Sequence, residues 1–119
     1  MTTALIIVDH GSKREAANDM LWEVVALLKS RRPQLMVKGA HMELCAPDIP
    51  SVIQNCIENG ATQLIIQPFM LSPGRHSTED IPNITAAAMA SYPKIPFTVT
   101  EHFGEHHLIT DIIFEKTGL

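Results

Sequence analysis

Apolar stretches of strand length alternate with helix-period segments along this chain. The stretch "ALIIV" at residues 4–8 is continuous and rich in β-branched side chains, which is typical of a parallel strand covered on both faces. Two longer stretches, "LMVKGAHMEL" at 35–44 and "QLIIQPFML" at 63–71, and the shorter "IPFTVTE" at 95–101 predict three more strands. Polar interruptions place 35–44 nearer a sheet edge, and we expect 63–71 to be central.

The segments between these strands carry apolar residues at three- and four-residue steps, the period of an amphipathic helix. Gly60 is expected to cap the second helix, and Asp80 to cap the third, with Pro82 in its first turn. The predicted helices are residues 13–31, 47–61, 80–92 and 108–116.

This alternation predicts an α/β fold with a four-stranded parallel sheet, right-handed crossovers and helices on both faces. A length of 119 residues, with no linker or internal repeat, favours a single domain over residues 1–119. Open sheets of this kind bind ligands beyond the carboxyl ends of their strands, where the strand order reverses.

Polar side chains follow each of the four predicted strands, so all of them map to that same edge of the sheet. Three of the chain's six histidines directly follow or end a strand, and a fourth lies in the loop after the third strand. The polar residues at this edge are His10, His41, Glu43, His76, Glu101 and His102.

Each of these residues has a structural alternative. His10 is either functional or part of a tight "HGS" turn in which Ser12 caps the next helix. His76 is either functional or a solvated loop residue. For His41 a structural or surface role is favoured over a functional one. Glu43 lies between apolar neighbours, where an unpaired carboxylate is costly, and this favours a function.

Two imidazoles and a carboxylate at one edge suit either of two kinds of chemistry. They can hold a transient divalent ion such as iron, cobalt, nickel or zinc, or they can abstract protons near neutral pH. The segment "HGSKR" has neither the Gly-x-Gly-x-x-Gly spacing of a dinucleotide site nor the Gly-x-Ser-x-Gly of a hydrolase elbow. No role is assigned to His102, His106 or His107.

Composition narrows the set of partners. A net charge of −4, 5% aromatic residues and no basic run longer than Arg31-Arg32 argue against nucleic acid. The first apolar stretch is shorter than the ~20 residues of a membrane span and lacks a preceding basic region, so we expect no membrane partner. Cys45 and Cys56 lack a Cys-x-x-Cys spacing, and both side chains are expected to be buried in the protein. We expect a reducing, intracellular compartment for the chain.

Four segments, "LIIVDHGSKREAAN", "MELCAPDIPSVI", "IIQPFMLSPGRHSTEDIP" and "TEHFGEHHLITDIIFEK", resemble the small CbiX/SirB-type class II sirohydrochlorin chelatases over about residues 4–116. The early "HGS" combined with the later "PGRH…DIP" is the most specific part. The resemblance implies a chelatase-like (flavodoxin-like) domain that inserts a divalent metal into sirohydrochlorin and releases two protons, with Fe²⁺, Co²⁺ or Ni²⁺ as substrate and no tightly bound cofactor.

The leading interpretation is a sirohydrochlorin ferrochelatase of sirohaem biosynthesis. A cobaltochelatase that leads toward cobalamin, or a nickel chelatase, is the first alternative, and a carrier that binds metal or tetrapyrrole without turnover is the second. The resemblance also implies a homodimer. We expect the cytoplasm as its compartment, or a plastid if a transit peptide has been removed.

The family's two metal-binding, proton-accepting histidines correspond to His10 and His76, and its acidic residue to Glu43. Sirohydrochlorin carries several carboxylates, so cations are needed near the site. The residues expected to bind it are Arg75, Ser12, Lys13 and Arg14. Asp9 is a departure, since a small residue is expected before His10; it either raises the basicity of the imidazole or only ends the strand.

Overall fold

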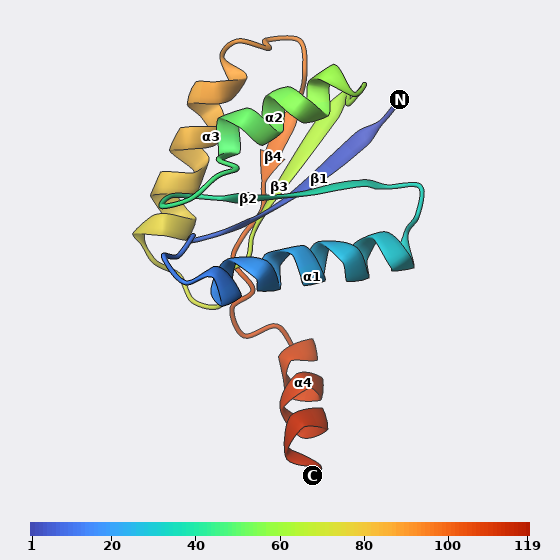
Figure 1. The fold of residues 1–119 in the computed structure, drawn as a ribbon, viewed down its shortest axis with the longest axis vertical. Helices are drawn as coiled ribbons and strands as arrows, with labels where there is room; N and C mark the ends of the chain where they lie inside the picture. The colour runs from blue at the N-terminus through green and yellow to red at the C-terminus, as the bar shows by residue number, and fades with distance from the viewer.

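A four-stranded parallel sheet forms the centre of the molecule (Figure 1). The structure is a computed structural model and describes all residues from 1 to 119. The strands β1 (Thr3–Asp9), β2 (Met36–His41), β3 (Gln63–Pro68) and β4 (Phe97–Val99) lie in the order β2-β1-β3-β4. The four predicted strands are therefore confirmed, with β2 at an edge and β1 and β3 in the centre. The strand order reverses between β1 and β3.

Helices cover both faces of this sheet, as the alternating pattern predicts. Helix α1 (Glu15–Arg31) lies against β1 and β2 on one face, and α2 (Ile49–Glu58) and α3 (Ile81–Met89) lie together on the other (Figure 1). Helix α4 (Leu108–Thr117) extends away from the sheet. None of the helices is both long and apolar enough to cross a membrane.

The main core lies between the sheet and the pair α2 and α3. Alternate residues of β1 point into it, because successive side chains of a strand point to opposite faces. Each large aliphatic side chain in this core contributes about 1.5–3 kcal/mol through its burial. The core residues include Ala4, Ile6, Val8, Ile49, Ile53, Leu64, Ile66 and Ile81.

The opposite face of the sheet is only partly covered. Helix α1 buries Leu21 and Val25 there, whereas Val24 and Leu28 border an apolar hollow of about 270 Å³ that continues over β3. Helix α4 does not fill this hollow, and it packs extensively against no other helix or strand. Its side chains Leu108, Ile112, Ile113 and Phe114 are 54%, 54%, 51% and 53% exposed.

The caps considered for α1 and α2 can be compared with the structure. Gly60 follows the last turn of α2 with φ +97°, so the predicted C-terminal glycine is confirmed. The alternative in which Ser12 caps α1 does not hold, because the helix starts later, with Arg14 at the N-cap position. The Ser12 hydroxyl instead accepts a hydrogen bond from the Arg14 N–H at 3.0 Å, within the turn that precedes the helix.

The helix after β3 begins at His76, earlier than predicted. Residues His76–Asp80 form one π-helical turn, η1, which continues directly into α3. The turn is anchored by Thr78, whose N–H and hydroxyl both donate to the Gly74 carbonyl, at 2.9 and 2.7 Å. Asp80 therefore lies inside a helical run and makes no capping hydrogen bond, so the predicted N-cap is wrong. His76 opens a helix rather than lying in a loop.

The two cysteines differ from each other. Cys56 is fully buried in the core, and burial raises the pKa of its thiol, while nearby Lys38 acts in the opposite direction. Cys45 is only half-buried, and both thiols are free. The expectation of burial is confirmed for Cys56 alone.

Candidate active site

The structure brings His10 and His76 into contact at the carboxyl edge of the sheet. Their ring centroids are 5.1 Å apart, and the rings are nearly perpendicular, at 89°. His10 directly follows β1, and His76 follows the connection that leaves β3. Because the strand order reverses between these two neighbouring strands, this is the position where open parallel sheets bind ligands. We call these two residues the histidine pair.

The spacing of the histidine pair is compatible with a shared metal ion. Two imidazoles that bind one ion at about 2.1 Å, with a tetrahedral angle, have ring centroids roughly 5 Å apart. No group of three or more His, Cys, Asp or Glu side chains is arranged to hold a metal ion. The pair by itself therefore offers two nitrogen ligands.

Asp80 fixes the orientation of His76. Its carboxylate lies 2.8 Å from Nδ1 of the imidazole, one helical turn away. A carboxylate only accepts hydrogen bonds, so Nδ1 is the donor and the free lone pair of the neutral ring is on Nε2. Sequence reasoning missed this role. The four-residue spacing in "HSTED" is the available signal, but it requires a helix that begins at His76.

Gly11 lets the loop after β1 pass close to the loop after β2. It has φ +85°, and a Cβ atom there would lie 1.8 Å from the Glu43 carbonyl oxygen. The Glu43 N–H donates to the His10 carbonyl at 3.1 Å, which holds the two loops together. Only glycine fits this position, since it alone combines a positive φ with the absence of a Cβ.

Ser12 is tied to the first turns of α1. Its N–H donates to Oδ1 of Asn18 at 2.9 Å, and Nδ2 of Asn18 donates back to the Ser12 carbonyl at 2.8 Å. A hollow of about 320 Å³ lies beside these groups and is also lined by His10, Gly11 and Phe69. The backbone that carries His10 is thus held on the side of α1 as well.

Glu43 is exposed to solvent, and its side chain makes no hydrogen bond or ion pair. The argument that its carboxylate would be costly to leave unpaired among apolar neighbours is therefore wrong, since water solvates it. Its backbone nevertheless lies next to His10. The loop that carries Glu43 is therefore joined to the loop that carries His10.

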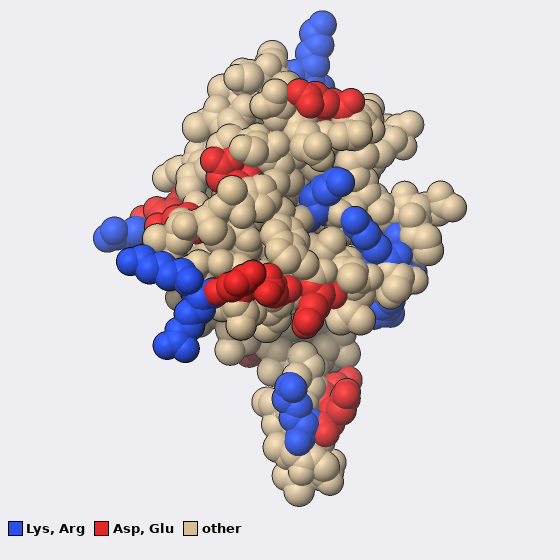
Figure 2. Space-filling view, viewed as in Figure 1, with Lys and Arg blue, Asp and Glu red and all other residues tan.

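The basic residues near the site are also exposed. Lys13, Arg14 and Arg75 form no ion pair, and none of their side chains is engaged in a hydrogen bond. In Figure 2 several basic side chains project at the edge of the molecule where the loops after β1 and β3 lie in Figure 1. These cations are free to meet an anionic ligand.

The remaining histidines do not join the pair. His41 is buried, with 1% of its side chain exposed, so of the two alternatives it is structural rather than on the surface. His102 borders a shallow hollow beside η1. His106 and His107 stack on each other at 4.5 Å, just before α4.

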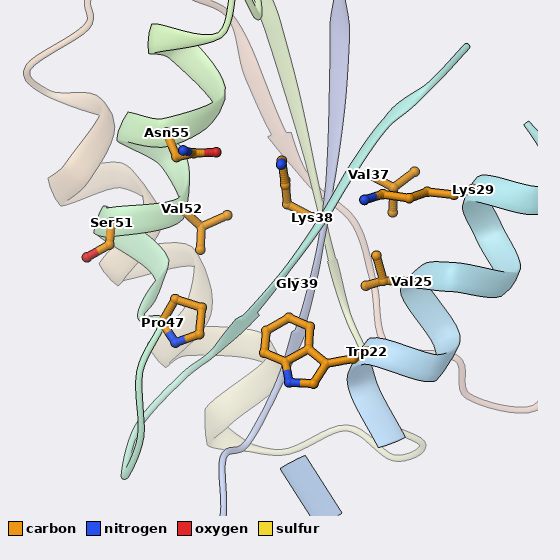
Figure 3. A pocket seen from close by; sticks show the side chains of 10 residues that line it. All are labelled: Trp22, Val25, Lys29, Val37, Lys38, Gly39, Pro47, Ser51, Val52 and Asn55. Carbon is orange, nitrogen blue, oxygen red and sulfur yellow. The ribbon is translucent and has the colours of Figure 1, made fainter. Parts of the chain in front are cut away.

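Another hollow lies on the free edge of β2, between α1 and α2 (Figure 3). It measures about 350 Å³ and is bordered by Trp22, Lys29 and Lys38. No His, Cys, Asp or Glu lines it. Its lining offers lysines but no imidazole, thiolate or carboxylate that would hold a metal ion, so we place the candidate site at the histidine pair.

Together, the strand order and the histidine pair define a flavodoxin-like α/β protein with an exposed imidazole site at the carboxyl edge of its sheet. Comparison with known families agrees with this class. The CbiX family model matches residues 4–118, and the chain belongs to the CbiX family.

Several characterised relatives are sirohydrochlorin chelatases. The chloroplastic sirohydrochlorin ferrochelatase of Arabidopsis thaliana is 39% identical over 112 residues, which is 94% of this chain and 50% of the plant protein. The sirohydrochlorin cobaltochelatase of Methanococcoides burtonii is 27% identical over 120 residues, or 94% of this chain and 92% of the archaeal one. This chain thus spans about half the length of the plant relative but nearly all of the archaeal relative.

Solved structures share the fold. The sirohydrochlorin chelatase SirB of Bacillus subtilis, crystallised with cobalt, matches with a TM-score of 0.91 and 24% identity over 99% of this chain and 50% of that one. A CbiX protein from Marinobacter aquaeolei matches with a TM-score of 0.80 and 20% identity over 98% of both chains. The arrangement of helices and strands therefore occurs both as half of a longer chain and as a whole chain.

The contact at Gly11 leads to a test of the loop geometry. We expect Gly11→Ala to lower the free energy of unfolding by about 1–3 kcal/mol, because the new methyl group meets the Glu43 carbonyl at a positive φ. Chemical denaturation measures this value. Gly74→Ala is the matched control, since a Cβ there meets open space. Equal stability of the two variants would contradict the described packing.

Proposed function

We propose that residues 1–119 act as a sirohydrochlorin ferrochelatase that inserts Fe²⁺ into the macrocycle as two pyrrole N–H protons leave. The observation that carries the proposal is the contact of His10 with His76, at 5.1 Å between ring centroids. Membership of the CbiX family and the ferrochelatase activity named for the plant relative support it.

The histidine pair suits both demands of this reaction. Metal insertion needs groups that hold a divalent ion loosely and accept protons on the same side of the ring, and imidazole does both near neutral pH. The hydrogen bond to Asp80 leaves the lone pair on Nε2 of His76 available to bind the metal or accept a proton. Glu43, exposed beside His10, is proposed to pass the released protons to solvent.

The charged substrate is proposed to bind through the basic loop residues. Sirohydrochlorin carries several carboxylates, and the guanidinium of Arg75 offers the fork that pairs with a carboxylate. Lys13, Arg14 and Ser12 lie in the loop after β1, close to His10 in the sequence, and Arg75 directly precedes His76. Cations beside each histidine are proposed to hold the macrocycle over the two imidazoles.

A cobaltochelatase is the second candidate. The cobaltochelatase from Methanococcoides burtonii is covered over 92% of its length, so it is a relative of this chain's own size. Two imidazoles bind Co²⁺ and Ni²⁺ more tightly than Fe²⁺ by the general affinity order, so these ligands do not identify the physiological metal. We propose the cytoplasm as the compartment, and the chloroplastic plant relative supports a plastid as the alternative.

The activity is tested by mixing the protein with sirohydrochlorin and Fe²⁺ and following the absorbance of the macrocycle. We expect insertion faster than with metal alone, and a lowering of kcat by about 100-fold or more for His10→Ala and for His76→Ala. Competition between Fe²⁺, Co²⁺ and Ni²⁺ in the same assay ranks the metals.

His107→Ala is the control for this assay, because His107 lies outside the histidine pair and is expected to keep its rate. If the unaltered protein gives no more than the uncatalysed rate, the enzyme proposal fails and only a carrier that binds metal or tetrapyrrole without turnover remains. Near-normal turnover of either His10→Ala or His76→Ala would exclude the histidine pair as the catalytic site.

Arg75→Ala is expected to raise KM for sirohydrochlorin about tenfold and to leave kcat nearly unchanged, because the clamp acts on binding. Steady-state kinetics at saturating metal measures both values. Arg32→Ala, at the far end of α1, is the matched control. A change confined to kcat at saturating substrate would contradict the clamp.

We also propose a homodimer in which α4 packs on a second copy. Four apolar side chains of α4 are more than half exposed, and the helix borders a hollow of about 710 Å³ with Phe69, Met70 and Phe103. A patch of this kind marks an interaction surface in a water-exposed protein. A chain that carries both an unpacked helix and a partly uncovered sheet is suited to reciprocal pairing with a copy of itself.

The dimer has its own test. We expect the unaltered protein to have the mass of two chains in light scattering and Ile112→Glu to have the mass of one, because the new carboxylate would be buried in the interface. Thr110→Glu on the same helix is the control, since the Thr110 hydroxyl bonds the chain's own His107 carbonyl. A monomeric unaltered protein would overturn the proposal.

A further inference from the structure

A polar pair lies directly beneath His10, where β1 and β2 end. Nδ1 of His41 lies 2.6 Å from Oδ1 of Asp9, and the two residues are register partners on the neighbouring strands. The same oxygen accepts the Gly11 N–H at 3.1 Å. One carboxylate oxygen therefore joins the end of β2 to the residue after His10.

This pair is well shielded from water. Only 1% of the His41 side chain and 17% of the Asp9 side chain are exposed. A hydrogen bond in such surroundings is stronger than one at the surface, and losing one partner leaves the other buried and unpaired. The contact between Asp9 and His41 therefore holds the ends of β1 and β2 firmly together.

Trp22 closes the pair from the side of α1. Its ring meets His41 edge to face, with centroids 5.3 Å apart and an angle of 75°. The indole lies over Gly39 in Figure 3, and a Cβ atom on that glycine would lie 2.6 Å from the ring. Gly39 therefore makes room for the tryptophan that shields His41.

The backbone around His10 is held by three hydrogen bonds. The carbonyls of Asp9 and His10 accept the N–H groups of Met42 and Glu43, at 2.9 and 3.1 Å, and the next N–H, that of Gly11, is bound by the Asp9 carboxylate. These bonds fix the path of the chain through His10. The imidazole of His10 itself is exposed and needs this support to stay near His76.

An apolar residue would fill the position of His41 at lower cost, because a buried polar pair gains little stability over well-packed apolar side chains. A role at the candidate site explains the buried Asp9–His41 pair better than a contribution to core stability does. We infer that Asp9 and His41 are positioning residues that hold His10 in register with His76. The inference rests on the proposed function, and neither residue is assigned a contact with metal or substrate.

The test uses Co²⁺ alone as the probe and measures its Kd by visible absorption. For Asp9→Ala and His41→Leu we expect a Kd at least tenfold weaker and a lower kcat at unchanged KM for sirohydrochlorin. Asp9→Asn keeps the accepting oxygen, and His41→Asn places an amide N–H where Nδ1 stood. Both should bind Co²⁺ within about threefold of the unaltered protein, since each retains the hydrogen bond.

Thermal melts show which variants are folded. Folded Asp9→Ala and His41→Leu proteins with unchanged Kd for Co²⁺ would overturn the inference, provided that His10→Ala loses binding. If His10→Ala also binds normally, the proposed histidine pair fails and the positioning role fails with it. If the alanine and leucine variants do not fold, the asparagine variants decide: a tenfold loss of Co²⁺ affinity in folded Asp9→Asn would contradict positioning by hydrogen bonds.

Discussion

The parallel pairing of β1 with β3 is the interaction on which the site depends. Their register runs from Thr3 opposite Gln63 to Val8 opposite Pro68, and the Phe69 N–H extends the pairing with a bond to the Val8 carbonyl at 2.6 Å. Because both strands are central and end at the same level, the segments that follow them start side by side. The apolar core fixes this register, since a slip of one residue would turn the buried side chains of β1 to the opposite face.

The two histidines are held in different ways. His76 stands on a π-helical turn and is oriented through its own ring by Asp80, whereas His10 stands in a loop that is fixed through its backbone. Exposed imidazoles on fixed supports suit an ion that must be taken up and released within one reaction cycle. Rigid supports also limit the entropy lost when metal and macrocycle bind.

The fold could be predicted from the sequence because it follows hydrophobic periodicity, which gave the four strands, their central and edge places, and the helices on both faces. Because parallel strands end at the same edge of a sheet, the residues that follow them, among them His10 and His76, could also be predicted to lie at one edge. Tertiary contacts decided the rest: Asp80 resembled a helix cap until the π turn placed it one turn from His76, and the Asp9–His41 contact depends on a strand register that no local pattern encodes. The exposure of Glu43 could not be predicted either, since it depends on how the loop after β2 turns.

The central claim is that one ion can be held by both imidazoles of the histidine pair. X-ray absorption spectroscopy of the Co²⁺-loaded protein counts these ligands directly. Two imidazole nitrogens are expected in the unaltered protein and one in His76→Ala. A coordination sphere without imidazole, or one that is unchanged in His76→Ala, would contradict it.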